Sequence, residues 1–262
     1  MKILMLHGYA QTGDTFRRKI HRLESRILGS HPKAEFIYLD APNKLETHDI
    51  PGLGQEQRPQ NNGDNTSSSH DMRAWFDLRI VQNPPTGLNR SLDMLAEVLK
   101  EQGPFDGIIA FSQGTVVGAM LASLLQGATR HRAYELASLQ TPSNTFAYPT
   151  SFLHLRHPPL KFALCYASRV GTGSYSDWMY ESPRLETPFC HFFGKWDPMV
   201  SFEEREAVLK RLCEDGECPR VFVHGGGHFV PNDQRSTEIA VGFVEMCMRS
   251  AKEREEDSGV EL

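Results

Sequence analysis

Residues 105–118 read F-D-G-I-I-A-F-S-Q-G-T-V-V-G, and this stretch decides the fold. An apolar run at 108–111 meets Ser112, and residues 115–125 then continue with apolar residues at helical spacing. The pattern predicts a buried strand that turns at Ser112 directly into a helix. Such a turn would hold the serine hydroxyl clear of its neighbours. It would also aim the free N–H groups of the helix N-terminus at one place.

Small residues flank this serine, with Ala110 two positions before it and Gly114 two positions after it. The spacing is close to G-x-S-x-G, which is typical of the nucleophile elbow of α/β-hydrolases. Ala110 adds one methyl group to the usual glycine, and alanine still leaves the strand and the helix room to approach. The alternative is a strand, a turn and a helix whose serine has no chemical role.

Composition sets the broad class of the protein. The 262 residues are 39% hydrophobic and 23% charged, which suits one globular α/β domain over residues 1–250 followed by a charged, frayed tail at 251–262. The net charge of −5 comes with mixed signs and without a basic stripe, so we expect no nucleic-acid partner. No apolar run is long enough for a membrane span or a secretory leader, and a cytoplasmic location is expected.

Cysteine usage argues against a metal centre. The five cysteines are scattered, and the C-x4-C pair of Cys213 and Cys218 has no second pair nearby. Reduced thiols are the simpler interpretation for an intracellular protein. No loop has the pattern that cradles phosphate, so we expect neither a metal nor another cofactor.

Short apolar runs alternate with helical patterns along the chain. This order predicts a mainly parallel central sheet with helices on both faces, the α/β-hydrolase fold. Besides the elbow, we expect strands at 2–6, 34–39, 161–167, within 184–193 and at 221–224, and helices at 12–28, 88–102, 202–213 and 234–249.

Two segments interrupt this alternation. Residues 43–71 are polar and rich in Pro, Gly, Asn, Gln and Ser, and we interpret them as a mobile rim loop over a cleft. Residues 127–160 form a lid-like segment with a short helix near 131–139. Its apolar residues do not fit a long helix face, and we expect them to form part of an acyl-binding wall. Ordinary packing of a loop onto the core is the alternative.

A serine nucleophile needs a base and an orienting carboxylate. Asp197 and His228 follow Ser112 in the order Ser, Asp, His, and each stands in a loop just after an expected strand. The glycines at 225–227 would let the backbone swing the His228 imidazole over the elbow. His224, at a strand end, is the rival base, and Asp177 is the rival carboxylate.

An oxyanion hole needs two backbone donors. We expect one from the N–H of Gln113, directly after the nucleophile. The other should come from the loop after the first strand, where Tyr9 is the best candidate and Ala10 the second.

Four motifs together resemble those of the FSH-type serine hydrolases. They are H-G-Y at 7–9, R-A-W-F at 73–76, F-D-G-I-I-A-F-S-Q-G at 105–114 and G-G-H-F-V-P at 226–231. That family includes ovarian-cancer-associated protein 2 and fungal esterases and thioesterases encoded beside polyketide synthases. The resemblance covers most of residues 1–250 and maps the family's nucleophile, acid and base onto Ser112, Asp197 and His228. We expect the following residues to contact substrate: Ala10, Trp75, Phe146, Tyr148, Phe152 and Phe229.

The leading functional hypothesis is a serine hydrolase that cleaves an acyl ester or thioester. The resemblance implies a fungal enzyme of secondary metabolism that releases a polyketide or fatty acyl chain from a carrier protein. A general short-chain carboxylesterase is the alternative among enzymes. A hydrolase homologue that binds a ligand without turnover is the alternative from another class.

Overall fold

The central sheet is fully parallel. The computed structural model describes residues 1–46, 71–78, 84–142, 145–171, 174–180, 183–212 and 220–257. Within them six strands form one sheet in the order β2-β1-β5-β6-β7-β8. The strands are β1 (Lys2–Leu6), β2 (Glu35–Leu39), β5 (Gly107–Phe111), β6 (Phe162–Tyr166), β7 (Phe189–Gly194) and β8 (Arg220–His224). The mainly parallel sheet predicted from the sequence is confirmed.

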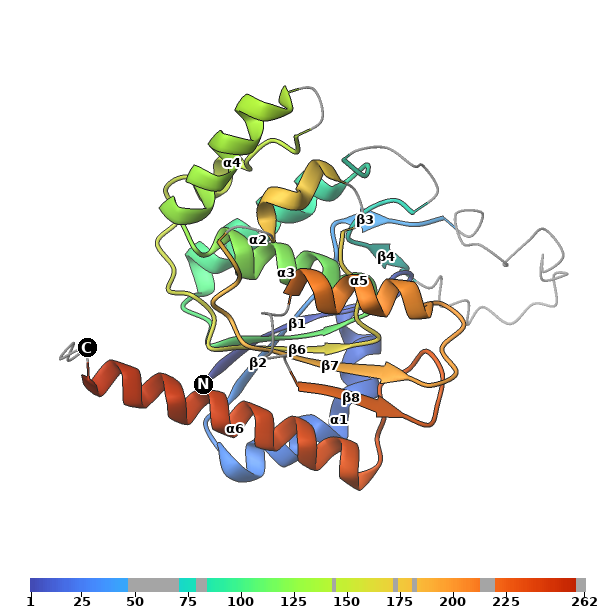
Figure 1. The fold of residues 1–262 in the computed structure, drawn as a ribbon. Coiled ribbons are helices and arrows are strands. Elements are labelled where there is room, and N and C mark those ends of the chain that lie inside the picture. Colours follow the sequence, from blue (N-terminus) through green and yellow to red (C-terminus); the bar gives the residue numbers. More distant parts are fainter. Residues whose placement is uncertain are drawn as a thin grey trace, which may run out of the picture.

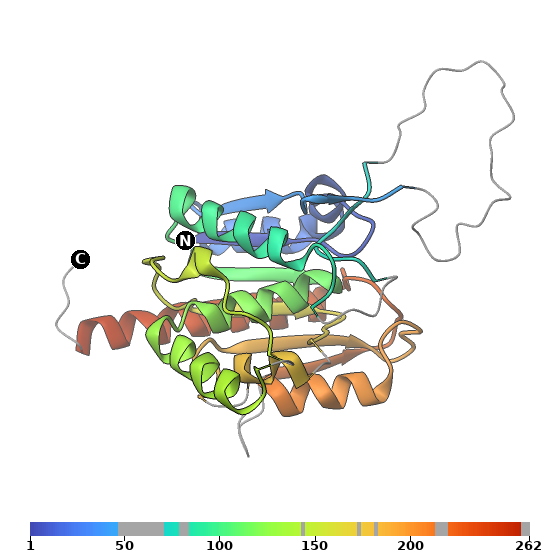
Figure 2. The same ribbon diagram turned by 90° about the horizontal axis from the view of Figure 1, so that it is seen from above.

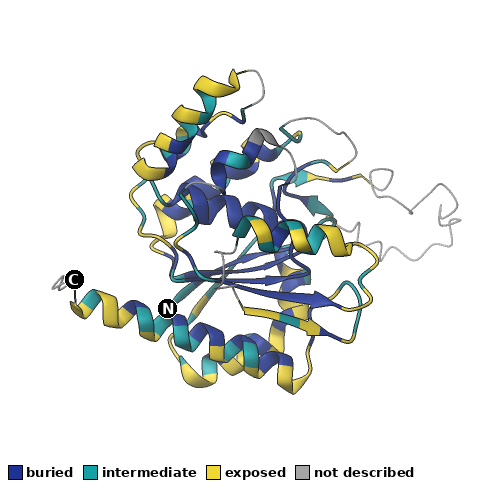
Figure 3. Cartoon of the chain, viewed as in Figure 1, coloured by how far each residue is buried: buried dark blue, intermediate teal, exposed yellow. Residues whose placement is uncertain are grey.

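Helices cover both faces of this sheet (Figure 1). On one face lie α1 (Gly13–Ser30) and α6 (Gln234–Asp257), which contact each other. On the other face lie α2 (Leu88–Gln102), α3 (Gln113–Leu124) and α5 (Phe202–Leu212), as the view from above also shows (Figure 2). Every residue of α3 is buried, whereas α4 (Ala128–Gln140), which packs outside α3, is largely exposed (Figure 3). The predicted arrangement of helices is therefore confirmed.

The carboxyl ends of the middle strands reach one edge of the sheet. Leu6 on β1 is opposite Ala110 on β5, which is opposite Cys165 on β6. Two of these strands end in a residue with a positive φ that is not glycine: Ser112 (φ 49°) follows β5 and Ala167 (φ 47°) follows β6. These sharp turns start the loops that build the site described below.

A two-stranded hairpin stands at the start and end of the polar segment predicted as a rim loop. Its strands are β3 (Asn43–Lys44) and β4 (Arg73–Ala74). The centre of that segment, residues 47–70, lies outside the described residues. Its mobility therefore stays a prediction. The hairpin brings residues 73–76 back against the body of the molecule, where they matter for the site.

The C-terminal end differs from the prediction. The closing helix expected at 234–249 is α6, which continues to Asp257, so residues 251–257 are helical rather than frayed. Two contacts explain the extension: Ala251 is buried, and Glu255 lies 3.1 Å from the Lys161 ammonium. Residues 258–262 lie outside the described part of the chain.

Three further features concern expected partners. None of the helices in the described ranges combines the length and apolar character that a bilayer crossing requires. Among the same residues no group of three or more His, Cys, Asp or Glu side chains could hold a metal ion. Cys165, Cys190 and Cys247 are buried and free, whereas Cys213 and Cys218 fall outside the described ranges.

Candidate active site

The turn at Ser112 has the geometry of a strained elbow. Ser112 has φ 49° and ψ −117° between β5 and α3, and its N–H donates to the Tyr166 carbonyl oxygen at 2.9 Å. A Cβ built at Gly114 would lie 2.6 Å from the His7 carbonyl oxygen, so only glycine lets α3 approach β1 this closely. Ala110 is accommodated because it faces Gly118, where an added Cβ would still lie 3.8 Å from its methyl group.

An imidazole lies within hydrogen-bond reach of the Ser112 hydroxyl. The loop after β8 carries His228, whose Nε2 is 2.9 Å from Ser112 Oγ. The ring leans against Phe111, with 5.1 Å between the ring centroids. Of the glycines before it, Gly226 has a neighbour that limits its side chain, because a Cβ there would lie 2.1 Å from the Phe229 ring.

A buried carboxylate orients this imidazole. Asp197 Oδ2 is 2.9 Å and Oδ1 is 3.1 Å from His228 Nδ1, and the Asp197 side chain is 1% exposed. Oδ1 also accepts the backbone N–H groups of Met199 and Val200 at 2.8 and 3.1 Å. The acid therefore has a fixed direction and favours the His228 tautomer with its proton on Nδ1, which leaves Nε2 to accept from Ser112.

The rival groups are engaged elsewhere. His224 Nδ1 accepts the N–H of Gly226 at 3.3 Å, its ring packs on Phe229, and burial lowers the pKa of its imidazole. Asp177 pairs with Arg211 at 2.7 Å. Neither is hydrogen-bonded to Ser112 or His228, so the geometry favours Asp197 and His228.

Two backbone segments meet beside the serine. Gln113 is the first residue of α3, and its N–H has no hydrogen-bond partner among the described residues. The loop after β1 brings Tyr9 and Ala10 to the same pocket, and Ala10 has a positive φ of 55°. The N–H of Ala10 is also without a partner in the described ranges. Both segments thus line the same pocket as Ser112.

His7 braces the second of these segments. Its Nδ1 donates to the Gly8 carbonyl oxygen at 2.7 Å, and its Nε2 accepts the N–H of Ala41 at 3.0 Å. Burial lowers the pKa of the His7 imidazole, in keeping with a neutral ring that accepts at Nε2. The sequence motif H-G-Y therefore begins with a structural histidine rather than a proton carrier.

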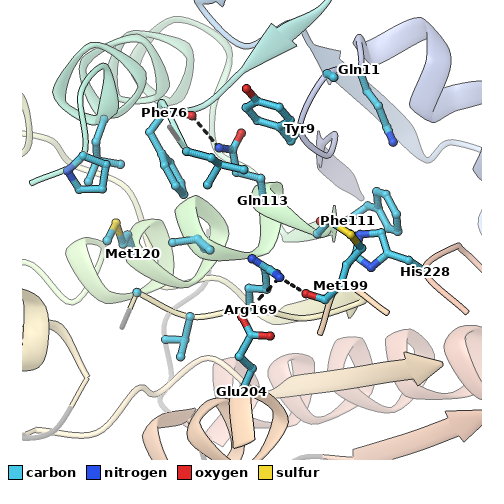
Figure 4. A pocket seen from close by; sticks show the side chains of 18 residues that line it. Tyr9, Gln11, Phe76, Phe111, Gln113, Met120, Arg169, Met199, Glu204 and His228 are labelled. Carbon is cyan, nitrogen blue, oxygen red and sulfur yellow. Dashed lines mark hydrogen bonds and ion pairs between the residues drawn. The ribbon is translucent and has the colours of Figure 1, made fainter. Parts of the chain in front are cut away.

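An apolar pocket of about 450 Å³ opens at the serine (Figure 4). Ser112, Val116 and Met120 line it at intervals of four residues along α3, so the pocket follows one face of this helix. Arg169, which donates to the Met199 carbonyl oxygen and pairs with Glu204 at 3.3 Å, forms its polar rim. Other lining residues that sequence reasoning missed are Phe76, Leu78, Pro85, Leu88, Phe111 and Val170. Among the lining residues that sequence reasoning missed, only Val116 and Met120 could have been found from the sequence, through their spacing from Ser112.

Of the residues expected to contact substrate, only Ala10 lines this pocket. Trp75 is fully buried and does not line it, and its backbone and indole N–H groups donate to protein acceptors. Phe229 stands beside the pocket without lining it and packs on His224. Contact of these two side chains with substrate therefore stays a prediction.

Three apolar side chains of the segment predicted as an acyl-binding wall are buried in the core. Phe146, Tyr148 and Phe152 are buried and do not line the pocket. The Tyr148 ring lies 5.7 Å from that of Trp178, whose indole donates to the Phe146 carbonyl oxygen at 3.1 Å. These apolar side chains are thus covered by protein, and the alternative of a loop packed onto the core fits the structure.

Comparison with known proteins places the chain in a family. The family model described as "Serine hydrolase (FSH1)" matches residues 1–239. Esterase OVCA2 of Danio rerio is 28% identical over 242 residues, covering 88% of this chain and 90% of that protein. A Schizosaccharomyces pombe protein named Dihydrofolate reductase is also 28% identical, over 88% of this chain. The chain spans 44% of that protein and 51% of an uncharacterized hydrolase from the same yeast, about half the length of each.

Solved structures agree on the fold. Acyl-protein thioesterase 2 of Zea mays superposes with a TM-score of 0.54 and 16% sequence identity, covering 94% of this chain and 93% of that one. Esterase PE8 gives the same TM-score at 19% identity. These likenesses show the α/β-hydrolase fold, and the match over residues 1–239 shows that the chain belongs to the FSH1 serine hydrolase family.

Proposed function

We propose that this protein hydrolyses carboxylic esters and thioesters of apolar acyl groups through an acyl-enzyme on Ser112. The observation that carries the proposal is the continuous hydrogen-bonded series from Ser112 Oγ to His228 Nε2, and from His228 Nδ1 to Asp197, with 2.9 Å at both links. This series opens onto an apolar pocket, beside two backbone N–H groups that have no partner within the described part of the chain. Membership of a serine hydrolase family supports the same reaction class.

The first half of the reaction forms the acyl-enzyme. Ser112 Oγ attacks the carbonyl carbon while His228 Nε2 takes the hydroxyl proton. The carbonyl oxygen becomes an oxyanion, and N–H donors from Gln113 and from Tyr9 or Ala10 stabilise it. Collapse breaks the bond to the alcohol or thiol, which leaves with the proton from Nε2. Asp197 stays ionised and stabilises the imidazolium.

The second half returns the enzyme to its starting state. Water attacks the acyl carbon, and His228 Nε2 again takes the proton. The oxyanion forms in the same place, collapses, and releases Ser112 Oγ, which recovers its proton from Nε2. The carboxylic acid then leaves. No other protein group has to gain or lose a proton in this cycle.

The acyl group fits the pocket better than the leaving group does. The pocket is lined largely by apolar side chains along α3, which suits an aliphatic or polyketide chain. Release of such a chain from a carrier protein, and a role in secondary metabolism, are the finer form of the proposal. They rest on the resemblance to fungal thioesterases.

A fluorophosphonate probe and a panel of p-nitrophenyl esters test the reaction class. Ser112→Ala should abolish labelling and lower kcat by about 10³-fold or more. Ser123→Ala is the matched control, since Ser123 is a buried serine on the same helix that donates to the Met179 carbonyl oxygen. Wild-type protein that neither labels nor turns over esters would favour the ligand-binding homologue.

The leaving group is tested separately. One acyl chain is offered as an oxygen ester, as a small thioester and as a thioester on a carrier protein. A gain in kcat/KM on the carrier protein would support chain release, and equal values for the three would support a general esterase. A preference for acetyl esters over longer chains would favour the short-chain carboxylesterase.

A further inference from the structure

Residues 73–76, here called the strap, cross between the two backbone segments of the candidate oxyanion hole. Trp75, in the strap, is fully buried and outside the pocket. Its backbone N–H donates to Gln113 Oε1 at 2.8 Å, and its indole N–H donates to the His7 carbonyl oxygen at 2.8 Å. One residue thus binds both segments, which lie more than a hundred positions apart in the sequence.

The side chain of Gln113 completes the link. Its Nε2 donates to the Phe76 carbonyl oxygen at 2.7 Å, while its Oε1 accepts from Trp75. The amide therefore pairs with the strap at both ends, like a backbone group in a sheet. Because the side chain is occupied in this way, the backbone N–H of the same residue keeps a fixed direction at the start of α3.

The other segment is held from its far side. The Trp75 ring lies 5.3 Å from the His7 ring, and His7 Nδ1 donates to the Gly8 carbonyl oxygen. A Cβ on Gly8 would lie 2.7 Å from the Phe111 ring and 3.3 Å from Ser112 Cβ. The loop after β1 is therefore pressed against the elbow, and a small shift of the His7 carbonyl would move it.

The strap itself is anchored by further hydrogen bonds. The Trp75 carbonyl oxygen accepts the Ser91 hydroxyl at 2.5 Å and the Asn43 amide at 3.1 Å. At its start, the N–H of Arg73 donates to the Gln11 carbonyl oxygen at 3.1 Å. The strap thus connects the two backbone segments to α2 and to the hairpin.

We propose that Trp75 is a positioning residue that sets the separation between the two halves of the oxyanion hole. The inference rests on the proposed function and adds to it a residue that touches neither substrate nor the reacting atoms. Oxyanion donors act because they are preorganised, and a displacement of about 1 Å can lower a rate by about 10²-fold. Trp75 supplies a hydrogen bond to each half and is itself held by α2.

The experiment compares Trp75→Phe with Trp178→Phe. Both substitutions remove a buried indole that donates to a carbonyl oxygen, but the Trp178 indole donates to Phe146, outside the site. We measure kcat and KM on one p-nitrophenyl ester, melting temperature, and the inhibition constant of a trifluoromethyl ketone with the same acyl chain. Ser112 Oγ adds to the ketone carbonyl, His228 takes the proton, and the resulting oxyanion occupies the hole.

Trp75→Phe should lower kcat about 10- to 30-fold and weaken the trifluoromethyl ketone by a similar factor, with KM within about 2-fold of wild type. Trp178→Phe should lower the melting temperature by a comparable amount and leave kcat and the inhibition constant unchanged. Gln113→Met, which keeps the backbone N–H but removes both side-chain bonds, should reproduce the Trp75→Phe pattern. It also serves if Trp75→Phe fails to fold.

Two results would overturn the inference. In one, Trp75→Phe and Gln113→Met lose melting temperature but keep kcat and ketone affinity, as the control does. In the other, KM rises while kcat is retained, which would make Trp75 a substrate-binding determinant. Failure of the proposed function is a separate result, because it appears as wild-type protein that neither turns over esters nor depends on Ser112.

Discussion

Two buried tryptophans occupy similar surroundings and differ in what they connect. Trp75 in the strap and Trp178 are at most 5% exposed, and each donates its indole N–H to a carbonyl oxygen. Trp75 binds the two segments beside Ser112. Trp178 belongs to what we call the aromatic layer, which consists of Tyr134, Phe146, Tyr148 and Trp178 and packs α4 against the rest of the molecule.

The difference shows that a buried aromatic residue need not contact substrate. In the aromatic layer, hydrogen bonds serve packing: the buried guanidinium of Arg130 donates to the carbonyl oxygens of Trp178 and Pro183 at 2.7 and 2.5 Å. Such bonds fix a core without reaching the pocket. In the strap, bonds of the same kind end on Gln113, an expected oxyanion donor, and on His7, which precedes the loop that carries the other expected donors, so their loss should reach the chemistry.

The largest expected effect is on kcat, and it distinguishes a carboxylate beside Ser112 from one beside the aromatic layer. Asp197→Asn should lower kcat by about 10²- to 10⁴-fold, because an amide cannot hold the reactive tautomer of His228 as the carboxylate does. Asp177→Asn, beside the aromatic layer, should leave kcat unchanged. Its partly exposed pair with Arg211 contributes less than about 1 kcal/mol to the free energy of unfolding. Equal losses of kcat in the two variants would contradict the assignment of the acid.

Phenylalanine truncations sharpen the comparison at the next level. Phe146→Ala should lower the free energy of unfolding by about 3–5 kcal/mol and lower kcat/KM equally for short and long acyl chains, if at all. Phe76→Ala, in the strap and the pocket wall, should lower kcat/KM more for long chains than for acetyl esters. A chain-length dependence in Phe146→Ala would restore the acyl-wall hypothesis for residues 127–160. Ester panels combined with urea unfolding provide the measurement.

A buried histidine should change stability without changing turnover. Burial lowers the pKa of His191 to about 3 from the ordinary value of 6.5, and its ring stacks between Phe189 and Phe193. Between these two pH values the unfolded chain binds a proton that the folded chain does not. This contribution to stability is therefore complete above pH 6.5 and is lost as the pH falls, by up to about 1.4 kcal/mol per pH unit.

His191→Phe should flatten that acid dependence in urea titrations between pH 6.5 and 4. Its kcat at neutral pH should match wild type, because the His191 ring is hydrogen-bonded to Ser168 and lies outside the pocket. An unchanged slope with pH would assign the acid sensitivity to other groups.

The smallest effect is expected at the elbow. Ala110→Gly should leave kcat within a few-fold of wild type, because Gly118 already leaves space for the Ala110 methyl group. Glycine gains freedom in the unfolded chain, so the free energy of unfolding should fall by about 0.5–1 kcal/mol. A large gain in kcat would show that the methyl group strains the turn.

Much of the fold follows from local patterns. The helix predicted at 88–102 is α2 with the same bounds, because its apolar stripe is regular and Gly87 and Gly103 flank it. Ser112, Asp197 and His228 could be placed together because parallel strands end at a common edge. The aromatic layer could not be predicted, since nothing local shows whether Phe146 or Tyr148 meets a ligand or another ring. The role of Trp75 escaped for the same reason: its acceptors come from Gln113 and His7, which only tertiary structure brings near.

The backbone conformations of Ala10, Ser112 and Ala167 have a consequence for how the sequence can change over generations. A left-handed residue other than glycine costs about 1–2 kcal/mol, and glycine in its place relieves that strain while adding about 0.5–1 kcal/mol of unfolded-chain entropy. A population selected for heat resistance alone should therefore accept glycine at 112 as readily as at 167. If turnover is also required, glycine at 112 should disappear, whereas position 167, outside the pocket, should remain open to it.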